Sequence, residues 1–203
     1  MKIIAVGRNY TEHIAELDHA VPDEPVIFLK PDTALLKNNG AFYLPGFSQE
    51  IHHEIEVVLR ICKEGKHVPE KFAGNYVDAV GLGIDFTARD LQQRLKKQGL
   101  PWERAKAFDH SAPVSPLRPI QSLDEVASLD FHLTLNGRIV QQGNTRQMLF
   151  PPARLISYIS TFITLRKGDL LFTGTPSGVG RVAIGDRLEG YLDGSKLLDF
   201  NIK

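Results

Sequence analysis

The chain has 203 residues, of which 42% are hydrophobic and 24% are charged, and its 24 Lys and Arg residues balance its 24 Asp and Glu residues. These proportions are typical of a globular protein, and the length suits one catalytic domain, which we expect to span 1–203. The balanced charge and the lack of a basic run argue against nucleic-acid binding, although they leave room for a local basic pocket that binds an acidic substrate.

The first 50 residues combine short apolar runs with four prolines, which favours loops and edge strands over long helices. Strands are predicted at 3–6 and 25–30, and 10–17 is predicted as a short helix or a mobile segment. The apolar runs are too short for a signal peptide or a membrane span. We therefore expect a cytoplasmic protein with no membrane partner, and a removed organelle-targeting segment would also fit.

The segment 51–62 alternates its side chains as a β-strand does. One face is apolar apart from His53 and is predicted to lie in the core. The other face begins polar and carries Glu54 and Glu56. Cys62, the only cysteine, ends the segment, so an intramolecular disulfide and a cysteine-rich zinc site are excluded and a buried thiol is expected.

The later segments alternate between strands and isolated helices. A second apolar strand, 76–86, carries Asp85 at its end, and 87–99 is predicted as a helix with Thr87 as its N-cap. The remaining predicted elements are a hairpin over 129–143 with its turn at Asn136–Gly137, a helix within 148–165 with a buried stripe of Leu155, Ile156, Ile159 and Phe162, and short strands in 169–180, 186–194 and 196–203. This pattern predicts a strand-rich α+β fold with one main core.

Three carboxylates form a candidate metal site. Side chains two residues apart on a strand point to the same side, roughly 7 Å apart, so Glu54 and Glu56 can converge on one ion. Asp85 closes the next strand, and three oxygen ligands suit Mg²⁺, Mn²⁺ or Ca²⁺ rather than structural zinc. His52 is on the same face and is a further candidate ligand. The alternative is a solvated polar face paired with arginines.

Two other groups are candidates for catalysis. His13 and Glu16 are three residues apart and face each other on a helical turn, where the carboxylate can hold the imidazole as a general base for water. The alternative is an exposed surface pair. Lys106 lies in a turn-rich segment, where its ammonium group can neutralise an acidic substrate or an oxyanion, unless it is simply solvated.

The glycine-rich segment TGTPSGVG, 173–180, lacks the ending of a Walker motif and the pattern of a nucleophile elbow. What remains is a turn of backbone N–H groups beside the hydroxyl of Thr175. Such a turn can hold a carboxylate.

Several long motifs occur in order along nearly the whole chain: VGRNY (6–10), HHEIE (52–56), DFTARDLQ (85–92), KQGLPWERAKAFDHSAPVS (97–115) and GDLLFTGTPSGVG (168–180). With these motifs the chain resembles the fumarylacetoacetate hydrolase family, in its short single-domain branch that includes mitochondrial acylpyruvase and oxaloacetate decarboxylase. We expect the chain to begin close to its first strand, without the N-terminal extension of longer bacterial members, and we expect no catalytic residue to be missing.

The resemblance implies a mixed β-sandwich roll with peripheral helices, of the type found in the C-terminal domain of fumarylacetoacetase, usually as a homodimer. It implies a divalent ion, usually Mg²⁺ with Mn²⁺ as the alternative, held at Glu54, Glu56 and Asp85. The other implied roles are a water-activating pair at His13 and Glu16, an active-site lysine at Lys106, and substrate-binding residues at Arg8, Arg89, Gln92 and Thr175.

The implied reaction is Mg²⁺-dependent hydrolysis of a carbon–carbon bond in acylpyruvates or related 2,4-dioxo acids, through a metal-bound enolate. The resemblance equally implies two alternatives that share this intermediate. One is decarboxylation or tautomerisation of oxaloacetate, and the other is isomerisation of 2-hydroxyhepta-2,4-diene-1,7-dioate in aromatic degradation. The expected partner is a small 2-oxo acid. A binding module with a purely structural ion is the competing class, and the retention of His13, Glu16 and Lys106 argues against it.

Overall fold

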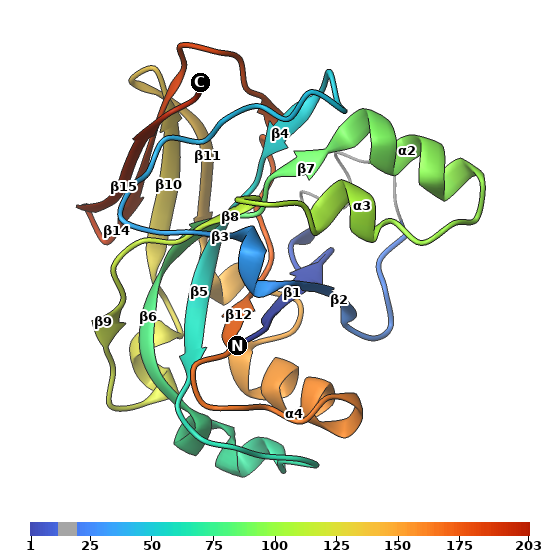
Figure 1. The fold of residues 1–203 in the computed structure, drawn as a ribbon. Coiled ribbons are helices and arrows are strands. Elements are labelled where there is room, and N and C mark those ends of the chain that lie inside the picture. Colours follow the sequence, from blue (N-terminus) through green and yellow to red (C-terminus); the bar gives the residue numbers. More distant parts are fainter. Residues whose placement is uncertain (12–19) are drawn as a thin grey trace.

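The computed structural model describes residues 1–11 and 20–203, and its elements are labelled as in Figure 1. The strands are β1 (Ile3–Gly7), β2 (Val26–Lys30), β3 (Leu35–Leu36), β4 (Ile51–His53), β5 (Ile55–Ile61), β6 (Val77–Ile84), β7 (Thr87–Ala88), β8 (Ala112–Pro113), β9 (Arg118–Pro119), β10 (Asp130–Leu135), β11 (Arg138–Asn144), β12 (Leu170–Phe172), β13 (Gly180–Arg181), β14 (Arg187–Leu192) and β15 (Ser195–Asn201). The helices are α2 (Arg89–Lys97), α3 (Glu103–Lys106) and α4 (Pro152–Phe162), with 3₁₀ turns η1 (Asp32–Ala34), η2 (Glu70–Tyr76), η3 (Leu123–Val126) and η4 (Thr145–Gln147).

Two main sheets organise the described part of the chain. The larger has the strand order β2-β1-β12-β5-β6-β9, in which β1 and β12 run parallel and the other neighbours are antiparallel. The second has the order β11-β10-β14-β15 and is antiparallel throughout. The mixed, strand-rich α+β organisation predicted from the sequence is therefore confirmed.

The core lies between these two sheets. Residues of β5 and β6 pack against β10, β14 and β15. The apolar side chains at this junction are almost wholly buried, and they include Ile55, Leu82, Leu133, Leu188 and Phe200. Burial of this size is the main source of folding free energy, and it holds β5 and β6 rigidly at the centre of the molecule.

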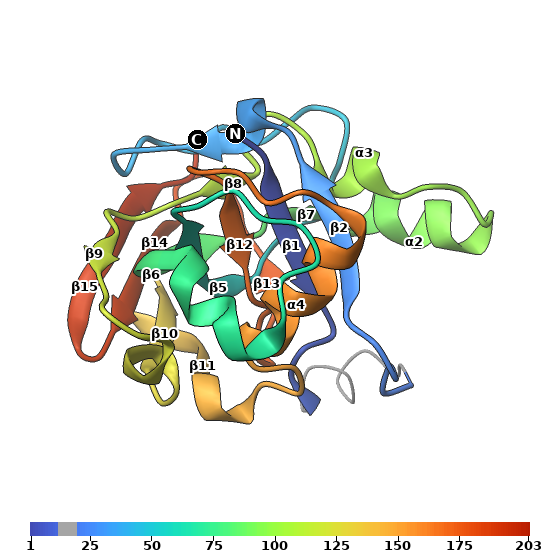
Figure 2. The same cartoon turned by 90° about the horizontal axis from the view of Figure 1, so that it is seen from below.

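Two small sheets and the helices surround this core. The three-stranded sheet β13-β4-β7 leads directly into α2, and α2 and α3 project together from one side of the molecule (Figure 1). The helix α4 packs against η2 at another end, beside the large sheet (Figure 2). The described residues contain no helix that is long and apolar enough to cross a membrane.

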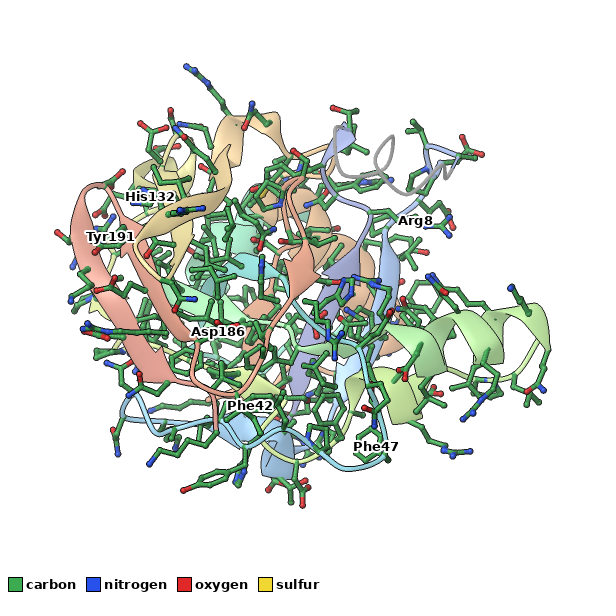
Figure 3. All side chains as sticks on the ribbon, turned by 90° about the horizontal axis from the view of Figure 1, so that it is seen from above. Arg8, Phe42, Phe47, His132, Asp186 and Tyr191 are labelled. Carbon is green, nitrogen blue, oxygen red and sulfur yellow. The ribbon has the colours of Figure 1, made fainter. Side chains whose placement is uncertain are left out.

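The predicted hairpin is present as β10 and β11. Its turn residues, Asn136 and Gly137, have φ angles of 53° and 77°, which is the left-handed geometry that a two-residue hairpin turn requires. On the neighbouring strands β10 and β14, His132 and Tyr191 stack with ring centroids 4.6 Å apart, and Figure 3 shows them side by side. The turn residues Asn136 and Gly137 were therefore sufficient to predict the hairpin of β10 and β11.

Four local expectations are corrected by the structure. The strand 51–62 is interrupted at Glu54, which divides it into β4 and β5. Thr87 does not cap α2, because it lies in β7 and its hydroxyl group donates to Glu54. The side chain of Phe162 is 61% exposed, since α4 ends there. Cys62 is only partly buried, because it follows the last residue of β5.

Candidate active site

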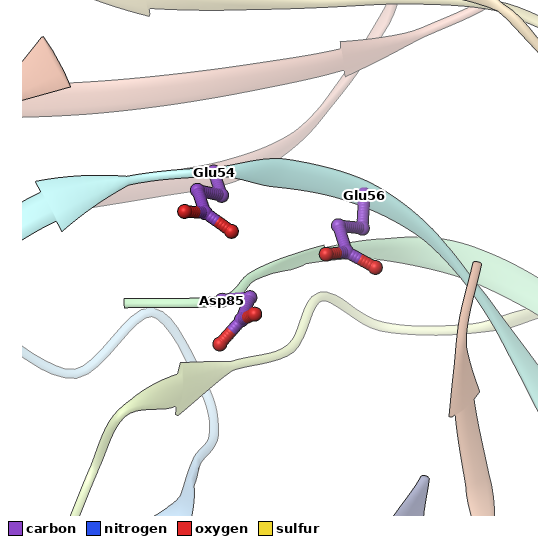
Figure 4. Close-up of side chains that lie close together, drawn as sticks. All are labelled: Glu54, Glu56 and Asp85. Carbon is purple, nitrogen blue, oxygen red and sulfur yellow. The ribbon is translucent and has the colours of Figure 1, made fainter. Parts of the chain in front are cut away.

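Three acidic side chains meet at the centre of the molecule. Glu54 lies at the break between β4 and β5, Glu56 lies in β5, and Asp85 directly follows β6. Each offers a carboxylate oxygen within 4.8 Å of the other two, and all three residues are buried. Figure 4 shows the three carboxylates directed into one space. The structure therefore brings together the three residues that the sequence pattern singled out.

The backbone of the central hairpin explains this convergence. The strands β5 and β6 pair antiparallel with Glu56 opposite Gly83. Beyond the end of β6, the N–H of Asp85 donates to the carbonyl oxygen of Glu54 at 2.8 Å. This bond places Asp85 beside Glu54, while the two-residue period of a strand keeps Glu56 on the same side.

Buried cations partner two of the carboxylates. The ammonium group of Lys106 donates to Glu54 Oε2 at 2.8 Å, to Asp85 Oδ2 at 2.5 Å and to Thr87 Oγ1 at 2.6 Å. The guanidinium group of Arg89 forms a further ion pair with Glu54. The alternative of a polar face paired with arginine is thus partly correct, but the face is buried rather than solvated. Lys106 belongs to the short helix α3, although the sequence suggested an irregular segment.

Lys30 is a site residue that the sequence analysis missed. It ends β2, is 1% exposed, and places its ammonium group 2.7 Å from Asp85 Oδ1. The same group donates to the hydroxyl of Ser111 at 3.0 Å and to the carbonyl oxygen of Lys106. The available signal was a lysine at the end of an apolar strand, directly before Pro31. Such a position is also common for solvated lysines, so the sequence alone did not identify it.

Glu56 lacks an ion pair among the described residues. The N–H of Gly174 donates to Glu56 Oε2 at 2.6 Å, so the glycine-rich turn does hold a carboxylate, but one of the protein itself. Burial raises the pKa of Glu56 well above its usual value, and the charges of Asp85 and Glu54 raise it further. A buried carboxylate next to two others is favourable only when a cation compensates the charge.

Gln141 connects the carboxylate strand to the glycine-rich turn, and the sequence analysis also missed it. Its Oε1 accepts from the N–H of Ile55 at 3.0 Å and lies 3.0 Å from His53 Nδ1. Its Nε2 donates to Thr175 Oγ1 at 2.8 Å and to the carbonyl oxygen of Pro176 at 2.9 Å. Because its partners lie far away in the sequence, only the fold identifies this amide as a bridge.

A cavity of about 250 Å³ opens above the carboxylates. Its wall is apolar at Val6, Val26, Phe28 and Trp102, and polar elsewhere. The predicted substrate-binding residues all line it, namely Arg8, Arg89, Gln92 and Thr175, together with Lys96 and Lys106. A small ligand with anionic and apolar parts fits this lining.

Three further residues predicted for the site, His13, Glu16 and His52, are not among the described residues that form the group of three carboxylates or line the cavity. His13 and Glu16 lie outside the described residues, so their pairing stays a prediction. His52, in β4, is not part of the three-carboxylate group. Burial lowers the pKa of His52, and the nearby charge of Arg89 lowers it further. The neutral imidazole is therefore the favoured form of His52 at pH 7.

The donor set fits a hard divalent cation. Three buried carboxylate oxygens converge, no cysteine contributes, and Glu56 forms no ion pair with the other described residues. Mg²⁺ and Mn²⁺ prefer such oxygen ligands, with water or substrate oxygens completing the coordination. Glu54, Glu56 and Asp85 are the residues that would hold the ion.

A strand-rich roll with a buried carboxylate cluster beneath a cavity lined by Arg and Lys side chains is the arrangement that the comparisons with known proteins must explain. Residues 2–199 match the family described as fumarylacetoacetate (FAA) hydrolase C-terminal, and the chain belongs to this family. The mitochondrial oxaloacetate tautomerase FAHD1 of Mus musculus is 41% identical over 99% of this chain and 91% of its own length.

Two solved structures also resemble this chain closely. A family protein from Yersinia pestis superimposes with a TM-score of 0.95 and 42% identity, covering 100% of this chain and 93% of its own. A fumarylpyruvate hydrolase from Pseudomonas aeruginosa, in complex with Mn²⁺ and pyruvate, superimposes with a TM-score of 0.94 and 37% identity, covering 100% and 89% respectively. The predicted β-sandwich roll of this family is therefore confirmed.

Proposed function

We propose that the chain is a divalent-metal-dependent hydrolase that cleaves a carbon–carbon bond in acylpyruvates or related 2,4-dioxo acids. The observation that carries this proposal is the group of three buried carboxylates, whose oxygens lie within 4.8 Å of one another below a cavity lined by cations. The Pseudomonas aeruginosa relative supports it, because that hydrolase was solved with Mn²⁺ and with pyruvate. Mg²⁺ is the ion we expect, with Mn²⁺ as a substitute.

The described residues would divide the work as follows. Glu54, Glu56 and Asp85 hold the ion, which when bound supplies Lewis-acid polarisation of the 2-oxo acid. Lys106 is 3% exposed and lies beside two of these carboxylates, so its ammonium group can offset negative charge that develops on the substrate. Arg89 and Gln92 are buried at the cavity wall, and Arg89 Nη1 donates to Gln92 Oε1 at 2.7 Å, which orients both toward a ligand.

The hydrolytic step needs a base for water, and this role is assigned to His13 with Glu16 through the family resemblance. Water attacks the distal carbonyl carbon and gives up a proton to His13. The bond between C3 and C4 then breaks, and its electron pair forms the enolate of pyruvate. Protonation at C3 releases pyruvate, and the acyl part leaves as a carboxylic acid.

Tautomerisation of oxaloacetate is the second candidate, and the name of the Mus musculus relative favours it. This reaction moves a proton between C3 and the 2-oxo oxygen and needs no attacking water. Both candidates pass through an enolate, so the described site serves either one. They differ in whether the base at His13 is required to activate water.

The test measures pyruvate release from acetylpyruvate and the keto–enol interconversion of oxaloacetate, with Mg²⁺ or Mn²⁺ and after chelation. We expect Glu56→Gln to lose at least 100-fold in kcat/KM together with metal affinity measured by calorimetry, as is typical for a lost metal-site group. The matched control is Glu64→Gln, an exposed carboxylate just beyond β5, which should behave as the wild type. Full activity in Glu56→Gln would exclude the metal assignment.

His13→Ala separates the two candidate reactions. If the chain is a hydrolase that uses this base, the variant loses acetylpyruvate hydrolysis and retains metal binding. Undiminished hydrolysis would contradict the assigned base. Rapid interconversion of oxaloacetate in a wild type that does not hydrolyse acetylpyruvate would favour the tautomerase, and oxalate binding without turnover of any 2-oxo acid would favour a binding module.

A further inference from the structure

One face of α2 carries three polar residues that line the cavity. Arg89, Gln92 and Lys96 are spaced by three and four residues, which places them on the same side of a helix. Arg89 is 6% exposed and reaches Glu54, so it marks the floor of the cavity. Lys96 is exposed and lies about 10 Å further along the helix axis, so it marks the mouth.

The position of Lys96 is fixed by an aromatic wall. Its ammonium group lies 5.4 Å from the ring centroid of Trp102, and that ring packs against Phe28 at 5.2 Å between centroids. Both rings line the same cavity. A cation held over an aromatic face is oriented without a carboxylate partner, so its charge stays available to a ligand.

Arg8 supplies a second cation to the same cavity from a different element. It directly follows β1, is half-buried, and has a φ of 58°, a conformation that is uncommon for an arginine. Figure 3 shows Arg8 on the side of the molecule where α2 lies. Strained backbone of this kind is often retained where it aims a side chain at a ligand.

Neither cation has an acidic partner within residues 1–11 and 20–203, where no salt bridge involves Arg8 or Lys96. Desolvation, followed by the positive charges of Arg8, Arg89 and Lys106, lowers the pKa of Lys96 to about 8. Glu54 acts in the opposite direction but is already paired with Arg89 and Lys106. Within the described part of the chain, the mouth of the cavity therefore carries positive charge that an anion would stabilise.

We propose that Arg8 and Lys96 form a second anion subsite, which binds the distal carboxylate of a dicarboxylic 2-oxo acid. The chain then prefers substrates with a carboxylate at both ends over analogues that end in a neutral alkyl group. The inference rests on the proposed function, in which the first carboxylate and the 2-oxo group would bind at the ion that Glu54, Glu56 and Asp85 would hold. Lys96 is thereby a specificity-determining residue.

The test compares two ligands that differ only at the distal end. Binding of 2-oxoglutarate and of 2-oxopentanoate, which have the same chain length, is measured by calorimetry in the presence of Mn²⁺. We expect the wild type to bind 2-oxoglutarate about tenfold more tightly, the size of one charge-assisted hydrogen bond. Lys96→Met keeps the alkyl stem on Trp102 but should bind both ligands within about twofold of each other.

Three variants complete the design. Lys96→Arg keeps the charge and should retain the preference, whereas Arg8→Gln should reduce it. Lys97→Met is the matched control, because Lys97 is the next residue of α2, is exposed and does not line this cavity. It should leave both affinities unchanged.

A dependence on pH gives an independent readout. Lys96 is protonated at pH 7 and loses its proton as the pH rises through about 8. The preference for 2-oxoglutarate should therefore fall in the wild type at high pH, while Lys96→Arg should keep it because a guanidinium group stays charged. Among residues 1–11 and 20–203, the charged groups that act on Lys96 are Arg8, Arg89, Lys106 and Glu54.

The outcomes separate this inference from the proposed function. Equal, metal-dependent binding of both ligands, or a preference that Lys96→Met does not change, would overturn the subsite and leave the proposed function intact. Absence of metal-dependent binding for either 2-oxo acid would overturn both. The same comparison extends to turnover with a 2,4-dioxo acid that ends in a carboxylate and its methyl-ended analogue, where KM should carry the difference.

Discussion

At the scale of single residues, Lys30 joins segments that are far apart in the sequence. Its ammonium group contacts the side chains of Asp85 and Ser111 and the carbonyl oxygens of Lys106 and Phe86. Burial lowers its pKa, and the charge of Lys106 lowers it further, while Asp85 favours the charged form. A group with these contacts fixes both the carboxylate of Asp85 and the backbone of Lys106.

Lys30→Met should destabilise the fold strongly. It leaves Asp85 and several buried carbonyl oxygens without their partner, and breaking a buried ion pair costs about 3–5 kcal/mol. The measurement is the free energy of unfolding from urea denaturation. Lys37→Met, which alters an exposed lysine, should stay within about 0.5 kcal/mol of the wild type. A Lys30→Met variant as stable as that control would show that the buried contacts contribute nothing.

Gly174→Ala should destabilise the turn that holds Glu56. Gly174 has a φ of +101°, and an added Cβ would lie 2.7 Å from the Cβ of Asn9. Gly185 is a matched control, because its φ is +94° and an added Cβ would meet no atom within 4 Å. Its alanine variant should cost only the backbone strain, about 1–2 kcal/mol. Thermal unfolding should show the larger loss at Gly174, and equal losses would exclude the contact with Asn9.

The sequence predicted part of the candidate site at this scale. Glu54 and Glu56 were identified because the period of a strand is local, and Asp85 because it ends the next apolar run. Lys30 and Gln141 were missed, because their roles depend on partners at least 34 residues away in the sequence. No periodicity within a segment reports such contacts.

At the scale of elements, α2 carries the cationic wall of the cavity, and Asp90 anchors its beginning. Asp90 accepts from Ser48 Oγ at 2.6 Å, from the N–H of Gln49 at 3.0 Å and from the N–H of Leu91 at 2.7 Å. Thr87 was predicted to start this helix, and the prediction was wrong because the tertiary partners Glu54 and Lys106 bind its hydroxyl group. A capping pattern depends only on neighbouring residues, whereas here the buried charged side chains of Glu54 and Lys106 bind the hydroxyl group of Thr87.

Asp90→Asn should destabilise the protein by about 1 kcal/mol at pH 7, the usual size of a lost anchor at a helix start. Partial burial raises the pKa of Asp90, but its hydrogen bonds to Ser48, Gln49 and Leu91 outweigh this and lower the pKa below 3.8. Its stabilisation is therefore present above pH 3.8 and is lost as the pH falls through the lowered pKa. Urea denaturation across this range should show the two proteins converging in acid. A difference that persists there would contradict the ionic anchor.

At the scale of the whole molecule, the α+β class followed from the alternation of strands and helices, and the roll followed from the family resemblance. The order of the large sheet was not predictable from local patterns. Its parallel pair joins β1 to β12, whose residues Ile3 and Leu170 lie opposite each other across almost the whole chain. Pairings of such sequence separation are set by the packing of the complete core.

The homodimer implied by the resemblance stays a prediction at this scale. Sedimentation velocity should give a particle of twice the chain mass of 22.6 kDa. The sedimentation coefficient should stay unchanged on moderate dilution, because obligate interfaces are large and apolar. A particle of the single chain mass at micromolar concentration would contradict it.

Glu54 stands where one strand of the small sheet ends and one strand of the large sheet begins. An ion shared by Glu54 and Glu56 would therefore stabilise the connection between β4 and β5, in addition to any part it has in turnover. When the ion is removed, amide hydrogens of β4 and β7 should exchange with solvent sooner than those of β5 and β6, whose protection comes from the apolar core. Occupancy of the metal site would then determine the rigidity of β4 and β7, the strands that lead into α2.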